Sequence, residues 1–282
     1  MGKKLTVTAL GGLCNRLRVL FSALTFHRET GIPVKLVWQA DWQCKAKYSH
    51  LFKPIKEEGF KVVEGGFFDK VTNHRNLYTP ALPRSFYYGK QFFNYHPNRN
   101  GNLIELFEKY NKIYLSTGYT LMPYTHEITT LLHPKTVLQD QVDFLCQRYT
   151  DNTVGVHIRR TDNEKSIIVS TDDAFIEAMK QEEGAKFFIA SDDEEVKWKM
   201  REIFKGRTIT QETDARRDIV RSLQDAVVDL YCLTRTRKIL GSYWSSFSDE
   251  AAEIGNIPMI PVGFTGIDPD DMEDEYDEDE DE

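Results

Sequence analysis

Short apolar segments rich in β-branched residues alternate along the chain with longer segments whose apolar residues recur every three or four positions. The short segments predict buried strands, and the long segments predict amphipathic helices. Strands are predicted over 4–10, 34–38, 112–116, 153–158, 186–190, 238–240 and 257–260. Helices are predicted over 13–29, 172–182, 193–204, 218–234 and 246–254. This alternation predicts parallel sheets joined by crossover helices, which is an α/β fold.

The hydrophobic pattern is less regular between residues 40 and 110, where aromatic residues are frequent. Such a segment forms either an irregular core beneath long loops or a platform on which sugar rings stack. Proline and mixed polar residues between 123 and 140 then indicate a crossing between domains. We predict an N-terminal domain over 1–135, a C-terminal domain over 136–265 and a disordered acidic tail over 266–282.

The charge of the chain is concentrated at its end. The formal net charge is −8, but residues 268–282 hold twelve Asp or Glu and no Lys or Arg. Without these twelve, 32 acidic residues face 36 basic ones, so the rest of the chain carries a net charge of +4. A weak and diffuse positive charge suits a small polyanionic ligand and argues against a nucleic-acid partner.

The four cysteines are widely separated and form no CxxC pair. This spacing argues against a zinc site and against a disulfide framework, and it favours a reducing compartment. No apolar run is long enough to span a membrane, and the N-terminal residues are typical of a strand rather than of a secretory signal. These features predict a cytoplasmic protein; the sequence leaves the oligomeric state undetermined.

Two arginines, Arg159 and Arg160, directly follow the predicted strand 153–158. An α/β sheet presents its ligand sites at the carboxyl ends of its strands. Each guanidinium offers a planar fork of donors that matches two anionic oxygens. The pair therefore predicts a phosphate-binding site, and the alternative is a surface salt bridge that ends the strand.

Polar residues also follow two other predicted strands of the C-terminal half. Three strand ends together supply His157, Arg159, Arg160, Ser191, Asp192, Asp193, Ser242, Ser245 and Ser246. The serines at a helix start offer hydroxyl and N–H donors to a phosphate. For Asp192 and Asp193 three interpretations stay open: they hold a ribose diol, ligate a divalent metal, or cap a helix.

Two further features have a functional and an ordinary interpretation. Gly11 and Gly12 stand between the first strand and the first helix, where they either let a ligand approach the backbone or form a plain tight turn. Their spacing is not GxGxxG, which argues against a dinucleotide cofactor, and no GxxxxGK[ST] loop is present. Asp225 and Asp229 share one stripe of the helix 218–234, where a carboxylate either accepts two N–H bonds from guanine or lies on a solvated face.

The sequence His-Ile-Arg-Arg-Thr-Asp at 157–162 resembles the HxRRTD motif of the α1,6-fucosyltransferase family, which includes nodulation-factor and core fucosyltransferases. Residues 188–193 and 225–254 resemble the second and third motifs of this family, and residues 11–17 are similar to an N-terminal segment of the wider fucosyltransferase superfamily. The resemblance implies a GT-B fold, with an acceptor-side and a GDP-sugar-binding Rossmann-like domain facing across a cleft. It also implies transfer of L-fucose from GDP-β-L-fucose to a glycan acceptor with inversion, and neither cofactor nor metal.

The resemblance further implies roles for individual residues. Arg160 is the essential diphosphate-binding arginine and Arg159 its neighbour. The guanine is held by His157 and Asp229, the ribose by Asp193 with Asp192, and the β-phosphate by Ser245. Asn15 lies on the fucose or phosphate side.

One position departs from the family pattern. Core-fucosylating members carry a glutamate seven residues beyond the second arginine, and this chain has Ile167 there. Glu164 is the nearest carboxylate and the candidate base. Two alternatives therefore stay open: a metal-dependent glycosyltransferase with another nucleotide-sugar donor, and a non-catalytic protein that binds a nucleotide sugar or a glycan.

Overall fold

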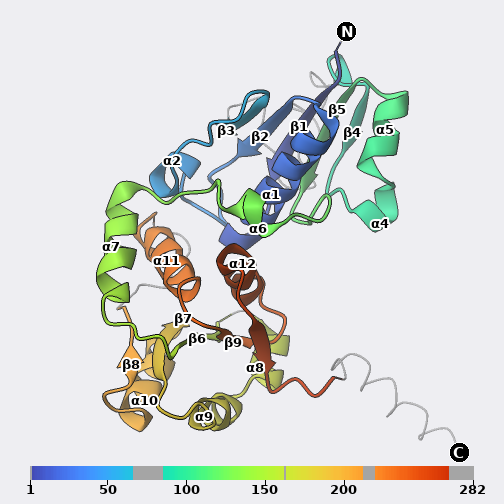
Figure 1. Ribbon diagram of the computed structural model, residues 1–282. Helices are drawn as coiled ribbons and strands as arrows, with labels where there is room; N and C mark the ends of the chain where they lie inside the picture. The colour runs from blue at the N-terminus through green and yellow to red at the C-terminus, as the bar shows by residue number, and fades with distance from the viewer. Residues whose placement is uncertain (1, 66–84, 162, 212–219, 267–282) are drawn as a thin grey trace, which may run out of the picture. The chain divides into compact units, whose positions relative to one another are not determined.

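The computed structural model describes residues 2–65, 85–161, 163–211 and 220–266. All but the first residue of the predicted acidic tail lies outside these ranges. The chain divides into two compact units, one made of Met1–Gln139 and Arg216–Val227, the other of Asp140–Ala215 and Val228–Glu282. Each unit is built on its own five-stranded sheet, and all strand pairs are parallel (Figure 1). The predicted α/β fold class is confirmed.

The sheet of the first unit has the strand order β3-β2-β1-β5-β4. Its strands are β1 (Lys4–Ala9), β2 (Val34–Trp38), β3 (Phe60–Glu64), β4 (Lys90–Phe92) and β5 (Lys112–Thr117). β1 lies at the centre, and in its register Val7 pairs with Leu36 of β2 and with Leu115 of β5. These three apolar residues are fully buried, as expected for central strands covered on both faces.

The helices of this unit begin with α1, which follows β1 directly. They are α1 (Leu13–Thr30), α2 (Tyr48–Leu51), α4 (Pro97–Asn100), α5 (Leu103–Lys109) and α6 (His126–Thr129). α1 ends at Gly31, whose φ of 67° is left-handed and thus suits a glycine. β3 and β4 occupy the segment in which no regular pattern was predicted. Both are edge strands with partly exposed side chains, so their hydrophobic signal is weak.

Some aromatic residues between 40 and 110 lie in the core, as the first interpretation of this segment predicted, and others are exposed, as a sugar platform would need. Tyr48, Phe52 and Tyr95 are buried in the core, whereas Trp42 and Phe86 are exposed. An irregular core therefore accounts for part of the segment, and a sugar platform stays a prediction for the exposed rings.

The sheet of the second unit has the order β10-β9-β6-β7-β8. Its strands are β6 (Thr153–Ile158), β7 (Lys186–Ser191), β8 (Thr208–Ile209), β9 (Ile239–Ser242) and β10 (Met259–Val262). β6 is the central strand and is buried at all six positions. Counted along the chain and read from the β8 edge, this is the order 3-2-1-4-5, which is that of the first five strands of a Rossmann-type sheet. β8, with only two residues, was not predicted.

The remaining helices are α7 (Thr136–Cys146), α8 (Glu164–Val169), α9 (Asp172–Lys180), α10 (Glu194–Ile203), α11 (Val220–Leu233) and α12 (Ser246–Gly255). α9 and α10 bury Phe175, Met179 and Met200 in one apolar cluster with Val154 and Val156 of β6. Gly155 and His157 alternate with these valines and therefore point to the other face of the sheet. A Cβ on Gly155 would lie 2.9 Å from Leu233 Cδ2 of α11, so the glycine permits close helix–strand packing.

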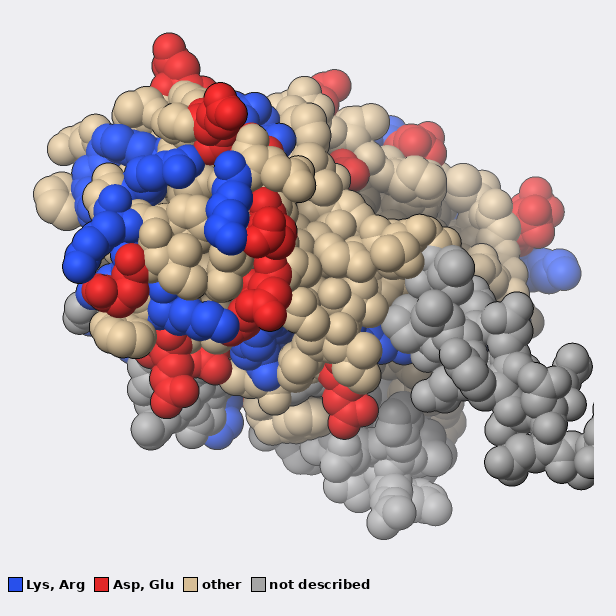
Figure 2. Space-filling view, turned by 90° about the horizontal axis from the view of Figure 1, so that it is seen from below, with Lys and Arg blue, Asp and Glu red and all other residues tan. Residues whose placement is uncertain are grey.

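The surface charge near α9 and α10 is mixed. Figure 2 looks from below Figure 1, the side on which these two helices lie, and basic and acidic side chains are interleaved there. Among the described residues on this face, the basic side chains form no extended surface of the kind that nucleic acid needs. None of the helices within the described ranges is both long and apolar enough to cross a bilayer.

Candidate active site

The three predicted strand ends of the second unit are neighbours in its sheet. β6 lies between β9 and β7, and the strand order reverses between β6 and β9. In register, Ile158 pairs with Ser191 of β7 and His157 pairs with Gly241 of β9. The polar residues that follow these strands therefore meet at the topological switch point, where α/β sheets bind ligands.

Arg159 is held on both sides by the neighbouring strand ends. Its backbone N–H donates to Ser242 Oγ at 2.9 Å, and its Nη1 lies 2.9 Å from Asp192 Oδ2. The side chains are only 17% and 10% exposed, so water screens this ion pair little. The salt bridge of the alternative interpretation is therefore present at Arg159, but it is shielded rather than on the surface, and contact of Arg159 with a phosphate stays a prediction.

Asp192 organises the turn that follows β6. Its carboxylate accepts the backbone N–H of Arg160 at 2.8 Å, the Thr161 hydroxyl at 2.6 Å and the Thr161 N–H at 3.2 Å. Burial on its own raises the pKa of Asp192, but the Arg159 charge and these hydrogen bonds outweigh burial and leave the pKa below its ordinary value. Asp162, the last residue of the predicted motif, lies outside the described residues.

Arg160 turns toward the start of α9. Its Nε and Nη2 donate to Asp172 Oδ1 at 3.1 and 2.7 Å, and its Nη1 donates to the Arg159 carbonyl at 2.8 Å. The guanidinium carbon also lies 5.8 Å from the centroid of the Phe175 ring. Asp172 was not among the predicted site residues, because an acidic residue in the first turn of a helix is common.

His157 is buried on the α12 side of the sheet. Its Nδ1 shares a hydrogen bond of 2.8 Å with Ser248 Oγ, and its ring stacks on Phe247 with centroids 4.6 Å apart. Burial lowers the pKa of His157 to about 3; Asp192 opposes this effect and Arg159 adds to it. The imidazole is therefore neutral at physiological pH.

Asp225 and Asp229 of α11 do not lie on a solvated face, because both side chains are buried. Arg221 Nε lies 3.4 Å from Asp225 Oδ1, one helical turn away. The ordinary interpretation of this pair is therefore wrong. Contact of Asp229 with a guanine stays a prediction.

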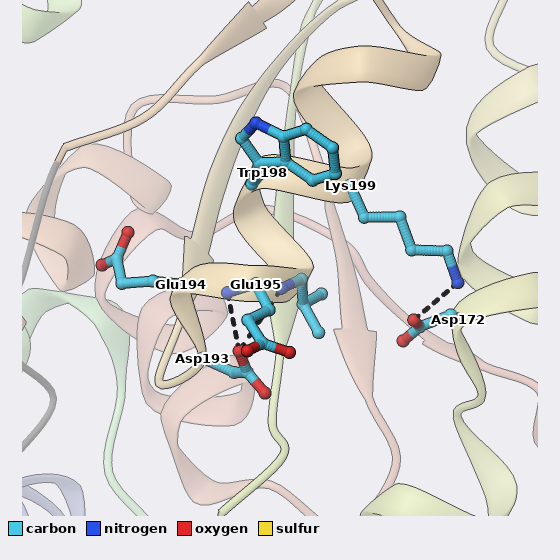
Figure 3. A pocket seen from close by; sticks show the side chains of 7 residues that line it. Asp172, Asp193, Glu194, Glu195, Trp198 and Lys199 are labelled. Atoms are coloured by element: carbon cyan, nitrogen blue, oxygen red, sulfur yellow. Dashed lines mark hydrogen bonds and ion pairs between the residues drawn. The ribbon is translucent and has the colours of Figure 1, made fainter.

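Asp193 caps α10. Its Oδ1 accepts the backbone N–H groups of Glu195 at 2.8 Å and Val196 at 3.3 Å (Figure 3). Capping is the most ordinary of the three interpretations and is observed; a ribose contact stays a prediction. Within the described residues, no group of three or more His, Cys, Asp or Glu side chains is arranged to hold a metal ion.

The start of α12 follows β9 closely and carries serine hydroxyls. Ser245 is the N-cap residue and is buried, but its side chain makes no capping hydrogen bond, and Ser246 is the first helical residue. Trp244, just before it, has a φ of 57° and is 60% exposed. Lys165 Nζ lies 4.6 Å from the Trp244 ring centroid, so an exposed aromatic and a cation stand together here.

Glu164, the candidate base, is the first residue of α8 and is exposed. Asn163 caps this helix by accepting the Ser166 N–H at 3.1 Å, and its Nδ2 donates to the Trp244 carbonyl at 2.8 Å. Ile167, at the family's glutamate position, is 37% exposed on the same short helix. A role for Glu164 as base stays a prediction.

In the first unit, the glycine turn after β1 is held by a residue that sequence analysis missed. Arg16 is fully buried; its Nε donates to the Gly11 carbonyl at 2.8 Å and its Nη2 lies 2.7 Å from Asp41 Oδ1. Gly11 has a φ of 86° and lies against the half-buried Asn15, whereas nothing lies within 4 Å of a Cβ built on Gly12. Gly11 is therefore packed closely against a side chain, whereas the space beside Gly12 is open.

No protein-family model and no curated protein sequence matches the chain. Its fold is similar to that of several solved structures. The fucosyltransferase NodZ from Bradyrhizobium matches with a TM-score of 0.65 at 16% identity, over 94% of this chain and 97% of that one. POFUT1 in complex with GDP-fucose matches at 0.58 and 14% identity, over 93% and 99%. A mutant of Arabidopsis thaliana FUT1 with GDP matches at 0.63 and 13% identity, over 96% and 72%.

At these identities the similarity concerns the fold. The chain has the fold of the GT-B fucosyltransferases, which is the fold that its sequence motifs predicted.

Proposed function

We propose that this protein is an inverting glycosyltransferase that transfers L-fucose from GDP-β-L-fucose to a hydroxyl group of a glycan acceptor. The observation that carries the proposal is the Arg159–Arg160 pair at the carboxyl end of β6, the strand at which the sheet order reverses. In support, structures with this fold include a NodZ crystal soaked with GDP-fucose and a POFUT1 complex with GDP-fucose. The second unit is the proposed GDP-sugar domain, and the first is the proposed acceptor-side domain.

The proposed reaction breaks the bond between C1 of fucose and the β-phosphate oxygen as the acceptor hydroxyl attacks C1 from the opposite face. Negative charge grows on the departing GDP, and the proton of the acceptor hydroxyl must leave. Arg160, Arg159 and the donors of Ser245 and Ser246 are the groups proposed to stabilise that charge. A preorganised donor aimed at a developing charge lowers a barrier by about 3 kcal/mol.

The rest of the donor has proposed contacts on neighbouring elements. His157 and Asp229 are proposed to hold the guanine, and Asp193 to hold the ribose. Because His157 is neutral, it offers guanine one donor or acceptor nitrogen rather than a charge. Gly11, Gly12 and Asn15 are proposed to contact the fucose or phosphate side, and Glu164 is the proposed base.

A metal-dependent glycosyltransferase is the less favoured alternative. Both oxygens of Asp192 are engaged by Arg159, Arg160 and Thr161, and Asp193 Oδ1 caps α10. A metal ion at this pair would compete with these hydrogen bonds. The arginine charge is proposed to play the part that a divalent cation plays in metal-dependent enzymes.

A non-catalytic nucleotide-sugar-binding protein is favoured by one observation, the apolar Ile167 at the position of the family's glutamate. Such a protein would bind GDP-fucose without releasing GDP over many turnovers.

The test combines binding with turnover. GDP and GDP-fucose should raise the melting temperature far more than UDP or CMP, since a ligand stabilises only the state that binds it. Purified protein with GDP-fucose, EDTA and a panel of glycans should release GDP over many turnovers. Binding without turnover would favour the non-catalytic alternative. Turnover lost in EDTA and restored by Mn²⁺ would favour the metal-dependent one.

A further inference from the structure

We propose that Asp172, which is itself paired with Lys199, is the positioning residue that orients the Arg160 guanidinium for the donor diphosphate. This inference rests on the proposed function, because it concerns how the diphosphate-binding arginine is held. Asp172 belongs to α9, not to the segment 157–162 that carries the arginines.

Three hydrogen bonds fix the guanidinium in its plane. Asp172 Oδ1 accepts from Nε and Nη2, and the Arg159 carbonyl accepts from Nη1. The Phe175 ring, 5.8 Å away, packs against the same group. An arginine side chain otherwise samples many rotamers, so these contacts reduce the entropy that a ligand would have to remove.

The contacts leave donors for a ligand. A guanidinium has five N–H groups, and three of those on Arg160 have acceptors among the described residues. Within the described ranges, one N–H of Nη1 and one of Nη2 have no such acceptor. The Arg160 side chain is 11% exposed, so it is partly accessible to solvent. Two N–H groups of one guanidinium can donate to two oxygens of a phosphate.

Lys199 prevents Asp172 from cancelling the charge of Arg160. Its Nζ lies 2.8 Å from Asp172 Oδ2, the oxygen that Arg160 does not use (Figure 3). Two cations around one carboxylate give this cluster a net charge of +1, so it still attracts an anion. Burial raises the pKa of Asp172, but the hydrogen bonds from Lys199 and Arg160 outweigh burial and leave the pKa below its ordinary value. The carboxylate therefore stays ionised at physiological pH.

The Asp172 carboxylate belongs to a helix that is packed on the sheet. Asp172 is the first residue of α9, whose N-cap Thr171 accepts the Ala174 N–H at 3.2 Å. Phe175 and Met179 of the same helix are fully buried beneath the sheet. A site group on a packed helix holds its position better than one on a loop.

The test compares Asp172→Asn and Lys199→Gln with a matched control on the same helix. Glu177→Gln removes a carboxylate of α9 whose salt bridge to Lys180 is exposed. Asp172→Asn should lower kcat for GDP-fucose about 10- to 100-fold, because a small misplacement of a reacting group costs that much. KM should change less, since the charge on the leaving group grows in the transition state. Lys199→Gln should lower kcat by about 3- to 10-fold because it acts through Asp172, and Glu177→Gln should leave kcat unchanged.

A double-mutant cycle separates positioning from a structural role. Lysine at position 160 keeps a charge but lacks the Nε–H fork. In an Arg160→Lys background, Asp172→Asn should therefore change kcat and the Kd of GDP by less than about twofold. The Arg160 Nε–H signal, followed by NMR without nucleotide, should be protected from exchange in the wild type and lose that protection in Asp172→Asn.

The outcomes distinguish the inference from the function on which it rests. An active wild type whose Asp172→Asn variant is equally active would overturn the inference alone. So would an equal loss of activity from Asp172→Asn in both backgrounds, which would mark a structural role. A wild type that neither binds GDP nor turns over GDP-fucose would overturn the proposed function and the inference with it.

Discussion

Arg159 and Asp192 form an ion pair of 2.9 Å that joins the ends of two neighbouring strands, β6 and β7. The same carboxylate holds the backbone N–H of Arg160 at 2.8 Å. Asp192 therefore contacts both arginines and holds the turn that follows β6. These protein partners of Asp192 were not predicted from the sequence, and its contact with a ribose stays a prediction.

The first prediction concerns this carboxylate. Asp192→Asn should reduce the free energy of unfolding by about 1–3 kcal/mol, because Arg159 would lose its charged partner in a shielded setting. The affinity for GDP should fall as well, since the turn that carries both arginines would loosen. Urea unfolding and GDP titration measure the two effects. Asp151→Asn, at an exposed position before β6, is the control; equal stability of the Asp192 and Asp151 variants would contradict the role of Asp192.

The second prediction separates capping from ribose binding at Asp193. Serine caps helices as well as aspartate, so Asp193→Ser should leave stability within about 0.5 kcal/mol of the wild type. Its shorter side chain would not reach a ribose, so GDP affinity should fall. Removing the ribose hydroxyls, as in dideoxy-GDP, should then weaken binding to the wild type but not to the variant. If Asp193→Ser binds GDP as the wild type does, Asp193 is only a cap.

The third prediction follows from the buried His157, whose pKa is about 3 in the folded state. The unfolded chain has an ordinary histidine pKa of about 6.5, so between these values the unfolded state binds more protons. Stability should therefore fall as the pH drops from about 6.5 toward 3, by up to about 1.4 kcal/mol per pH unit from this group. His157→Gln should flatten the profile measured by urea unfolding. The exposed His133 provides the control, and an unchanged slope in His157→Gln would contradict the assignment.

The fourth prediction compares the two glycines of the first unit. Gly11 has a φ of 86°, and a Cβ there would lie 2.7 Å from Asn15 Nδ2. Gly11→Ala should thus cost about 1–2 kcal/mol of stability. Gly12 is the N-cap residue of α1, its φ is −71° and the space beside it is open, so Gly12→Ala should cost only the N-cap preference for glycine over alanine, about 0.5–1 kcal/mol. If substrate approaches this backbone, Gly12→Ala should still lower kcat/KM for GDP-fucose by about 10-fold or more. Kinetics identical to the wild type would contradict that approach.

The sequence predicted the central strands and the position of the arginines because both depend on local signals. β1 and β6 are buried along almost their whole length, and both are short segments rich in β-branched residues. β3 and β4 have partly exposed side chains and β8 has only two residues, so their hydrophobic signal is weak and all three were missed. The motif at 157–162 was recognised by its resemblance to a motif of the α1,6-fucosyltransferase family.

What the sequence did not predict are partners distant along the chain. Arg16 reaches across to Asp41, and Arg160 reaches Asp172 twelve residues further on. No periodicity or motif predicts such ion pairs, since they depend on how the fold brings the two side chains together. Asp225 and Asp229 illustrate the same limit, because their spacing fitted a solvated face whereas both side chains are buried.

The most direct measurement of the central claim is the affinity for GDP in the wild type, Arg159→Ala and Arg160→Ala, with guanosine as the reference ligand. The arginines are proposed to bind the diphosphate alone. Arg160→Ala should therefore weaken GDP binding about 100-fold, or about 2.7 kcal/mol, while guanosine binding stays unchanged. Arg160→Ala and Arg159→Ala variants that fold and bind GDP as tightly as the wild type would contradict the account.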